Sequence, residues 1–287
     1  MKIAESCIIC KNSKLKKSPA VLMPFLAHRI FEWKPVNISG NWKLKTIKNG
    51  MAYSICNTVQ CMECGLIFLD IRFNKREMNR LYKGYREKEY TDLRDKYEPG
   101  YKHRNKELNT TISYIADVEN FLSPYLKFPI NLLDWGGDTG KNSPFKNKTR
   151  TFHIYDISDK PLVERAEKVD KTTIINTNYD LIVCSNVLEH VPYPKEEIIN
   201  IKKSMQKDTL LYIEIPYEDI FHDSDLQEQK NLYKKKKYWH EHINFFTEIS
   251  LKKLFYICGL SIIDSKKIKK LIGAKKINLY QFLTKLQ

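Results

Sequence analysis

The stretch Leu132-Leu133-Asp134-Trp135-Gly136-Gly137-Asp138-Thr139-Gly140-Lys141 decides how the rest of the chain is interpreted. A short apolar run ends in an acid and is followed by a glycine-rich bend. Glycine leaves the backbone open, so a ligand can approach it without meeting a Cβ. The pattern predicts a buried strand, a tight turn, and then a helix whose first N–H groups face a carboxylate or a phosphate.

A second acid stands 20 residues after Gly136, at Asp156, where the apolar run Thr151–Asp156 ends. The carboxyl ends of neighbouring parallel strands lie at the same edge of a sheet. We therefore expect Asp156 to lie beside the glycine bend and to accept hydrogen bonds from ribose hydroxyls. A dinucleotide turn requires G-x-G-x-x-G, and no register of this stretch supplies it.

Short apolar runs alternate with helical stretches from residue 129 onward. The runs expected to be strands are Ile130–Asp134, Thr151–Asp156, Lys171–Asn176, Tyr179–Cys184, Thr209–Ile215, Leu260–Asp264 and Ile277–Leu283. Such alternation predicts an α/β domain over 129–287, with a doubly wound, seven-stranded, mostly parallel Rossmann-like sheet. Before it we expect a small β module over 1–72 and a helical connector over 73–128, which Pro99-Gly100 divides.

Four of the seven cysteines form the pairs Cys7-x-x-Cys10 and Cys61-x-x-Cys64. Two such pairs offer four thiolates to one tetrahedral ion, so the spacing predicts a closed, structural zinc site. A disulfide framework is the weaker interpretation, because the first residues lack the apolar core of a signal peptide and we expect a cytoplasmic protein. Cys56 could replace a ligand, but burial is favoured for it, and also for Cys184 and Cys258.

The chain carries 49 Lys+Arg against 34 Asp+Glu, a formal charge of +15. This balance favours an anionic partner, either a nucleotide-linked small molecule or, less favoured, nucleic acid. A biased base composition of the gene would also enrich Lys, so the charge alone does not identify the partner. No apolar stretch is long enough for a membrane span. The run Lys234–Lys237 is interpreted as a solvated loop.

Residues 130–287 resemble the class I S-adenosylmethionine-dependent methyltransferases. Their first motif, [DE]-x-G-x-G-x-G, is matched except that Asp138 replaces the middle glycine, where its carboxylate could meet the amino group of the methionine moiety. The segment Tyr179–Val191 resembles the fourth-strand motif of that family, with Val187-Leu188-Glu189-His190-Val191 at its end. The resemblance implies an S-adenosylmethionine site made of Asp134, Gly136, Gly137, Asp138, Gly140, Asp156 and Ser185.

With Cys61–Phe68 and Leu81–Arg86 included, the chain is similar to methyltransferases that carry an N-terminal zinc module. These include sugar C-methyltransferases and enzymes of surface-polysaccharide pathways. The segment Trp239–Thr247 resembles their E-H-x-x-x-F motif, which implies that Glu241 and His242 face the acceptor. An insertion at about 218–240 would then form part of an acceptor lid.

Methyl transfer from a sulfonium is an in-line displacement, and an oxygen or carbon acceptor must also lose a proton. His242 and His190 are the candidate bases, with Glu241 beside them, although His190 could instead only cap a helix or pack. The spacing of the histidines predicts no metal site. The predicted function is methyl transfer to a nucleotide-linked sugar or surface glycan. An RNA methyltransferase and a non-catalytic scaffold with this fold are the alternatives.

Overall fold

The larger sheet of the protein lies in the C-terminal half of the chain. A computed structural model describes residues 1–38, 50–108, 114–221, 228–272 and 275–287. Its seven strands run in the order β10-β9-β8-β11-β12-β16-β15. Their bounds are β8 Ile130–Trp135, β9 Thr149–Tyr155, β10 Glu167–Lys168, β11 Leu181–Ser185, β12 Leu210–Pro216, β15 Leu260–Ile272 and β16 Lys275–Leu286. The first five strands of this order are parallel, and β16 is antiparallel to both β12 and β15. The predicted seven-stranded, mostly parallel sheet is confirmed.

Helices cover both faces of this sheet because neighbouring side chains of a strand point to opposite sides. In β8, Leu133 belongs to the core under α7 (Pro194–Lys202) and α9 (Glu248–Ile257), whereas Leu132 belongs to the core under α5 (Ile115–Leu122). Both leucines are fully buried. The strands therefore read as continuous apolar runs, as expected for a doubly wound sheet.

The prediction of a strand at Lys171–Asn176 was wrong. Lys171–Ile175 forms helix α6, and the side chain of Asp170 accepts a hydrogen bond from the backbone N–H of Thr173 as its N-cap. This cap outweighs the β propensity of the β-branched residues. The third strand position is taken by β10, two charged residues without an apolar signal.

The helix expected after the glycine bend does not form. Residues 136–148, all of them described, make a series of turns that lead into β9. Phe145 has φ of +56° and is buried within this segment. Pro144 lacks an N–H, and the Ser143 side chain donates its hydrogen bond to Asp134 rather than capping a helix. The bend therefore offers individual backbone amides and no helix N-terminus.

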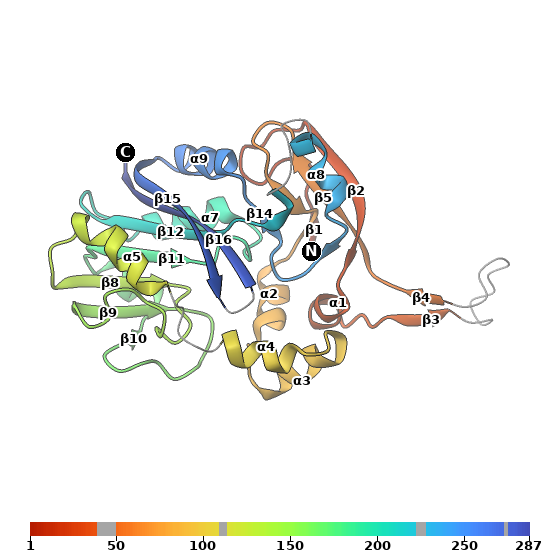
Figure 1. Ribbon diagram of the computed structural model, residues 1–287, viewed down its shortest axis with the longest axis horizontal. Coiled ribbons are helices and arrows are strands. Elements are labelled where there is room, and N and C mark those ends of the chain that lie inside the picture. Colours follow the sequence, from red (N-terminus) through yellow and green to blue (C-terminus); the bar gives the residue numbers. More distant parts are fainter. Residues whose placement is uncertain (39–49, 109–113, 222–227, 273–274) are drawn as a thin grey trace.

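The N-terminal module contains a second sheet, which the C-terminal half completes. β2 (Leu15–Leu22), β5 (Ile55–Cys61) and β6 (Ile67–Leu69) are antiparallel neighbours. β13 (Tyr238–Trp239) pairs with β2, and β14 (Asn244–Phe245) pairs with β6, giving the order β13-β2-β5-β6-β14. The two strands that flank Glu241 and His242 thus belong to the N-terminal sheet, and Figure 1 shows the two sheets side by side.

Helices of the connector lie between and below the two sheets in Figure 1. They are α2 (Lys75–Tyr82), α3 (Lys88–Tyr97) and α4 (Tyr101–Leu108), and the break between α3 and α4 falls at Pro99-Gly100 as predicted. The smaller elements are α1 (Pro24–Phe31), β1 (Lys2–Ile3) paired with β7 (Ile71–Arg72), and β3 (Val36–Ile38) paired with β4 (Gly50–Ala52). In the described part of the chain, no helix is long and apolar enough to cross a membrane.

The predicted insertion at 218–240 lies partly outside the described residues, which omit 222–227. Its described part holds two 3-10 turns, η3 (Asp219–Phe221) and η4 (Glu228–Asn231), then α8 (Leu232–Lys235) and β13. Within the lysine run, Lys236 is half-buried and its ammonium lies over the rings of Trp239 and Phe245, at 5.1 and 4.4 Å. The interpretation of this run as a solvated loop was therefore wrong for Lys236.

Candidate active site

The glycine bend packs directly against the segment that follows β11. Gly136 has φ of +83°, and a Cβ there would lie 2.4 Å from Cγ2 of Val187. A Cβ on Gly137 would lie 2.6 Å from Cγ of Asp134. Asp138, at the middle position of the motif, keeps the left-handed conformation with φ of +50°, which aspartate tolerates better than most residues. The bend is thus closely packed even with aspartate in place of the glycine.

The carboxylates of the predicted cofactor site lie together at the carboxyl ends of β8 and β9. Oδ2 of Asp156 accepts a hydrogen bond of 2.9 Å from the backbone N–H of Asp138, and Oδ1 accepts one of 2.6 Å from that of Ser158. Asp134 is buried beneath the bend and accepts a hydrogen bond from the Ser143 hydroxyl. Burial raises the pKa of the Asp134 carboxyl to about 7.

The side chain of Asp138 points to the loop after β9. It forms an ion pair of 3.1 Å with Nζ of Lys160 and accepts a 3.1 Å hydrogen bond from the Ser158 hydroxyl. Ser185, at the end of β11, donates a 2.8 Å hydrogen bond to Oε1 of the buried Glu214. Asp138 and Ser185 therefore both hold loops of the crevice in place, and their predicted contacts with the cofactor stay predictions.

His190 and His242 are brought into edge-to-face contact, with ring centroids 4.7 Å apart. Nδ1 of His190 lies 3.1 Å from the backbone oxygen of Glu241 and 3.0 Å from the Tyr82 hydroxyl. Nδ1 of His242 lies 2.7 Å from Oε1 of Glu218. The structure thus joins the two histidines that the sequence placed 52 positions apart.

The surroundings move the pKa values of this group in opposite directions. Burial lowers the pKa of His190 to about 3, so its imidazole is neutral. Burial also lowers the pKa of His242, but its hydrogen bond to Glu218 and the nearby charge of Glu189 outweigh it and leave a net rise. Burial raises the pKa of the Glu189 carboxyl to about 7.

Glu241 is turned toward the connector. Its Oε2 lies 2.7 Å from Nη1 of Arg94, and its Oε1 accepts a hydrogen bond from the Tyr90 hydroxyl. Burial opposes the ionisation of Glu241, but the Arg94 guanidinium outweighs it and lowers the pKa to about 2. Both carboxylate oxygens of Glu241 thus contact side chains of α3 and connect this helix to the segment that carries His242.

The four predicted zinc ligands converge on one point, and their sulfurs lie within 4.8 Å of one another. The Sγ atoms of Cys7 and Cys64 are 3.6 Å apart, as are those of Cys10 and Cys61. Sulfurs at the corners of a tetrahedral zinc site, with bonds of about 2.3 Å, lie about 3.8 Å apart. Cys56 lies elsewhere, buried, with its thiol donating to the backbone oxygen of Ala20. Cys184 and Cys258 are buried as predicted.

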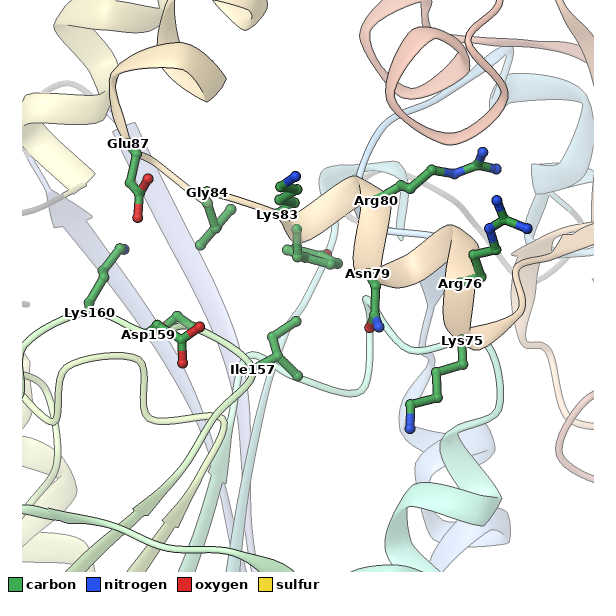
Figure 2. Close-up of a pocket in the computed structure, with 13 residues that line it drawn as sticks. Lys75, Arg76, Asn79, Arg80, Lys83, Gly84, Glu87, Ile157, Asp159 and Lys160 are labelled. Atoms are coloured by element: carbon green, nitrogen blue, oxygen red, sulfur yellow. The ribbon is translucent and has the colours of Figure 1, made fainter.

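A cleft of about 760 Å³ lies between two segments of the chain. One segment is α2 together with the residues that follow it, and the other is the loop after Asp156. Figure 2 shows α2 facing this loop, with Lys160 and Glu87 pointing toward one another across the gap. The lining residues are Lys75, Arg76, Asn79, Arg80, Tyr82, Lys83, Gly84, Tyr85, Glu87, Ile157, Ser158, Asp159 and Lys160. Tyr82 both lines the cleft and contacts His190, so this side chain lies between the cleft and the histidines.

Sequence reasoning assigned no site role to several residues of this region. Glu218 and Tyr82 orient the histidines, and Lys160 pairs with Asp138. Arg86 is half-buried with φ of +62°, and its Nε has no hydrogen-bond partner among the described residues. For Tyr82 and Arg86 the sequence signal was the similarity of Leu81–Arg86 to the zinc-module subgroup, and Glu218 begins the predicted acceptor-lid insertion. No sequence signal marked Lys160.

The strand order, the glycine bend and the acid at the end of β9 define a class I S-adenosylmethionine-dependent methyltransferase domain. A family model described as a methyltransferase domain matches residues 102–265, and the chain belongs to this family. No protein of curated function matches the chain. S-Adenosylmethionine is the methyl donor of this class.

Several solved structures similar to the chain are described as methyltransferases, and another is described as a [4+2]-cyclase. One is the 1,6-didemethyltoxoflavin-N1-methyltransferase of Burkholderia thailandensis, at 16% identity over 77% of this chain and 95% of that one, with a TM-score of 0.49. Another, from Methanosarcina mazei, has 16% identity over 58% and 96%, with a TM-score of 0.43. A third, from Clostridium acetobutylicum, has 15% identity over 69% and 98%, with a TM-score of 0.41.

Proposed function

We propose that the protein transfers a methyl group from S-adenosylmethionine to an anionic sugar substrate, with a nucleotide-linked sugar favoured over a surface glycan. In this proposal the cofactor lies on the glycine bend, and Asp156 accepts hydrogen bonds from its ribose. Each oxygen of Asp156 accepts one backbone hydrogen bond and has a further lone pair for a hydroxyl. With no helix after the bend, the backbone amides of Gly137 and Thr139 are the donors proposed for the methionine carboxylate. The amides of Gly136, Asp138 and Gly140 already donate within the protein.

The charge of the residues that line the cleft is the observation that supports an anionic substrate. Five cations line it, and the acids in its lining are Glu87 and Asp159. Asp159 is itself paired with Lys168, at 2.6 Å, and Lys160 is paired with Asp138, at 3.1 Å. The cations are Lys75, Arg76, Arg80, Lys83 and Lys160. A wall of this sign attracts phosphate or other anionic groups and raises their local concentration. A diphosphate held there would place its sugar toward Tyr82 and His190.

The zinc module has a positioning role in this proposal. We infer that Cys7, Cys10, Cys61 and Cys64 hold a structural zinc ion, because their sulfurs already have nearly the separation that tetrahedral zinc imposes. Cys61 ends β5, and β6 follows and pairs with β14. The zinc site would therefore stabilise the strand that begins two residues after His242.

The experiment is to incubate the protein with labelled S-adenosylmethionine and, separately, a panel of nucleotide sugars and total RNA. We expect label in a nucleotide sugar and a raised KM for that sugar in Arg76→Glu. Lys266→Glu, an exposed charge reversal on β15, is the matched control and should leave the KM unchanged. Label found only in RNA, with binding that falls steeply as salt rises, would establish the nucleic-acid alternative instead. If S-adenosylhomocysteine also fails to raise the melting temperature, the scaffold alternative holds.

A further inference from the structure

Two histidines and a glutamate from separate segments gather beside the cleft. Glu189 and His190 follow β11, and His242 lies between β13 and β14. One metal-ligating atom from each of the three lies within 4.8 Å of the other two. Nε2 of His190 is 3.8 Å from Oε1 of Glu189. The group lies far from the four cysteines in sequence. The sequence analysis predicted metal binding only at those cysteines.

The hydrogen bonds of His190 determine which of its nitrogens carries the proton. Its Nδ1 lies 3.1 Å from the backbone oxygen of Glu241, and a carbonyl oxygen can only accept. Because the Tyr82 hydroxyl, 3.0 Å from Nδ1, can donate or accept, the contact with the carbonyl is the observation that favours Nδ1 as the protonated nitrogen of the neutral ring. Nε2 is left with a lone pair, which is directed toward the carboxylate of Glu189.

His242 has the same arrangement. Its Nδ1 lies 2.7 Å from Oε1 of Glu218, and an ionised carboxylate can only accept, so Nδ1 donates and Nε2 is left for another partner. Metal-bound histidines usually donate their other ring N–H to a carboxylate or a backbone carbonyl, which orients the ring. Glu218 and the backbone of Glu241 supply one such partner to each histidine.

Glu189 is the third member of the group, and its carboxylate has no hydrogen-bond partner in the described part of the chain. Its side chain is 1% exposed, and both of its oxygens lack a partner among the described residues. A buried carboxylate without hydrogen bonds is strongly unfavourable unless a positive charge compensates it. The groups nearest Glu189 are the imidazoles of His190 and His242, so the compensating charge must come from a protonated imidazole or from a bound cation.

We propose that Glu189, His190 and His242 bind a divalent transition-metal ion. Two imidazoles and one carboxylate suit Mn²⁺, Fe²⁺, Co²⁺ or Zn²⁺ and leave coordination positions open. Ligand atoms that share an ion at about 2.1 Å lie about 3–3.5 Å apart, so binding contracts the group by about 1 Å. The His242 side chain is 38% exposed, which places the open positions on the solvent side of the cluster.

A cation at this position would explain how the acceptor loses its proton. Tyr82 lines the cleft and contacts His190, so the cluster is separated from the cleft by this one side chain, and an acceptor hydroxyl would have to pass it to reach the ion. A bound cation lowers the pKa of a hydroxyl that coordinates it. His242 would then act as a ligand and not as the free base. This role in catalysis rests on the proposed function, whereas metal binding itself does not.

The test is a calorimetric titration of the purified full chain with Mn²⁺, together with electron paramagnetic resonance of the bound ion. Mn²⁺ is chosen because thiolates prefer softer ions, so the four cysteines do not compete for it. We expect one Mn²⁺ per chain in the wild type, and at least tenfold weaker binding in Glu189→Gln and in His242→Asn. His240→Asn is the matched control, because His240 faces Glu98 at 3.3 Å and lies outside the cluster; it should bind Mn²⁺ like the wild type.

The melting temperature provides a second measurement. Without metal, Glu189→Gln should be more stable than the wild type, because it removes a buried charge. With Mn²⁺, only the wild type and His240→Asn should gain stability. The rival arrangement, in which protonated His242 pairs with Glu189, predicts no Mn²⁺ binding and a less stable Glu189→Gln.

The possible results separate this inference from the proposed function. Mn²⁺ binding that depends on Glu189 and His242 supports the metal site even if no sugar is methylated. Sugar methylation by a protein that binds no Mn²⁺ or Co²⁺ at 1 mM overturns the metal site and leaves the proposed function standing. Equal Mn²⁺ binding by all three variants also overturns it.

Discussion

Nη1 of Arg72 lies 2.8 Å from Oδ1 of Asn244, a residue 172 positions away in the sequence. The same nitrogen donates to the backbone oxygen of Pro192, and the Asn244 amide donates to the backbone oxygens of Leu188 and Val191. Both side chains are 1% exposed. One buried guanidinium thus connects the end of the N-terminal module, the segment after His242 and the loop that carries Glu189 and His190.

Arg72→Lys should lower kcat at least tenfold and leave the dissociation constant of S-adenosylhomocysteine unchanged within about twofold. Lysine cannot reproduce the planar set of donors, so the loop at 188–192 loses its support while the glycine bend does not. Lost hydrogen bonds to a charged group should also lower the free energy of unfolding by about 2–3 kcal/mol. Kinetics, calorimetry and urea unfolding measure the three effects.

Arg150→Lys is the control for this substitution. Arg150 forms a 3.1 Å ion pair with Asp180, but its side chain is 53% exposed, so the change should alter the free energy of unfolding by less than about 1 kcal/mol. Arg72→Lys with unaltered kcat would show that the guanidinium does not position the histidine loop.

Asp156→Ala should weaken the binding of S-adenosylmethionine by about 1.5–3 kcal/mol in a calorimetric titration, because hydrogen bonds to a charged carboxylate are lost. Asp156→Asn is the companion variant. Its amide oxygen can replace only one of the two acceptors, so Asp156→Asn should keep one backbone hydrogen bond, from Asp138 or from Ser158, and should weaken binding less than Asp156→Ala. An unchanged titration for Asp156→Ala would exclude Asp156 from the cofactor site.

Removal of one cysteine ligand should release the zinc ion and destabilise the module. We expect one zinc per wild-type chain in elemental analysis, and loss of zinc with a lower melting temperature in Cys10→Ser. Cys56→Ser should retain its zinc, because its thiol contacts the Ala20 backbone away from the other four sulfurs. Equal zinc contents in the wild type and Cys10→Ser would contradict the assignment.

The stability of the protein should depend on pH through Asp134. The pKa of this carboxyl rises from 3.8 to about 7 on folding because of burial, so the folded protein holds a proton that the unfolded chain releases near pH 4. The stabilising contribution is present in full below the unfolded pKa and is lost as the pH rises to about 7. A shift of this size corresponds to up to about 4 kcal/mol between pH 4 and pH 8.

Asp134→Asn should remove this part of the pH dependence. Urea unfolding at pH 4.5, 6 and 8 measures it, and the free energy of unfolding of the variant should fall less steeply across this range than that of the wild type. Parallel slopes for the two proteins would show that Asp134 is already ionised in the folded state at pH 4.5.

Local sequence signals predicted those parts of the protein whose structure depends on residues close together in the chain. Runs such as Ile130–Asp134 become strands because most of their side chains are apolar, and the break at Pro99-Gly100 follows from the missing proline N–H and the freedom of glycine. The expected strand at Lys171–Asn176 failed because one N-cap from Asp170 outweighed several β-branched residues. The helix predicted after the glycine bend does not form, because the Ser143 hydroxyl donates to Asp134 and Phe145 has a positive φ. Neither feature can be predicted from the periodicity of apolar residues.

By itself, the sequence determined the class of sheet, the glycine bend with its neighbouring acid, and the grouping of the cysteines into two pairs. All three depend on residues that are close in the chain or follow a regular period. Only the tertiary structure decided that His190, His242 and Glu189 share one site, that Glu241 turns away to Arg94, and that β13 and β14 complete the N-terminal sheet. These are contacts between distant segments, and their hydrogen bonds and buried charges exist only after the chain has folded.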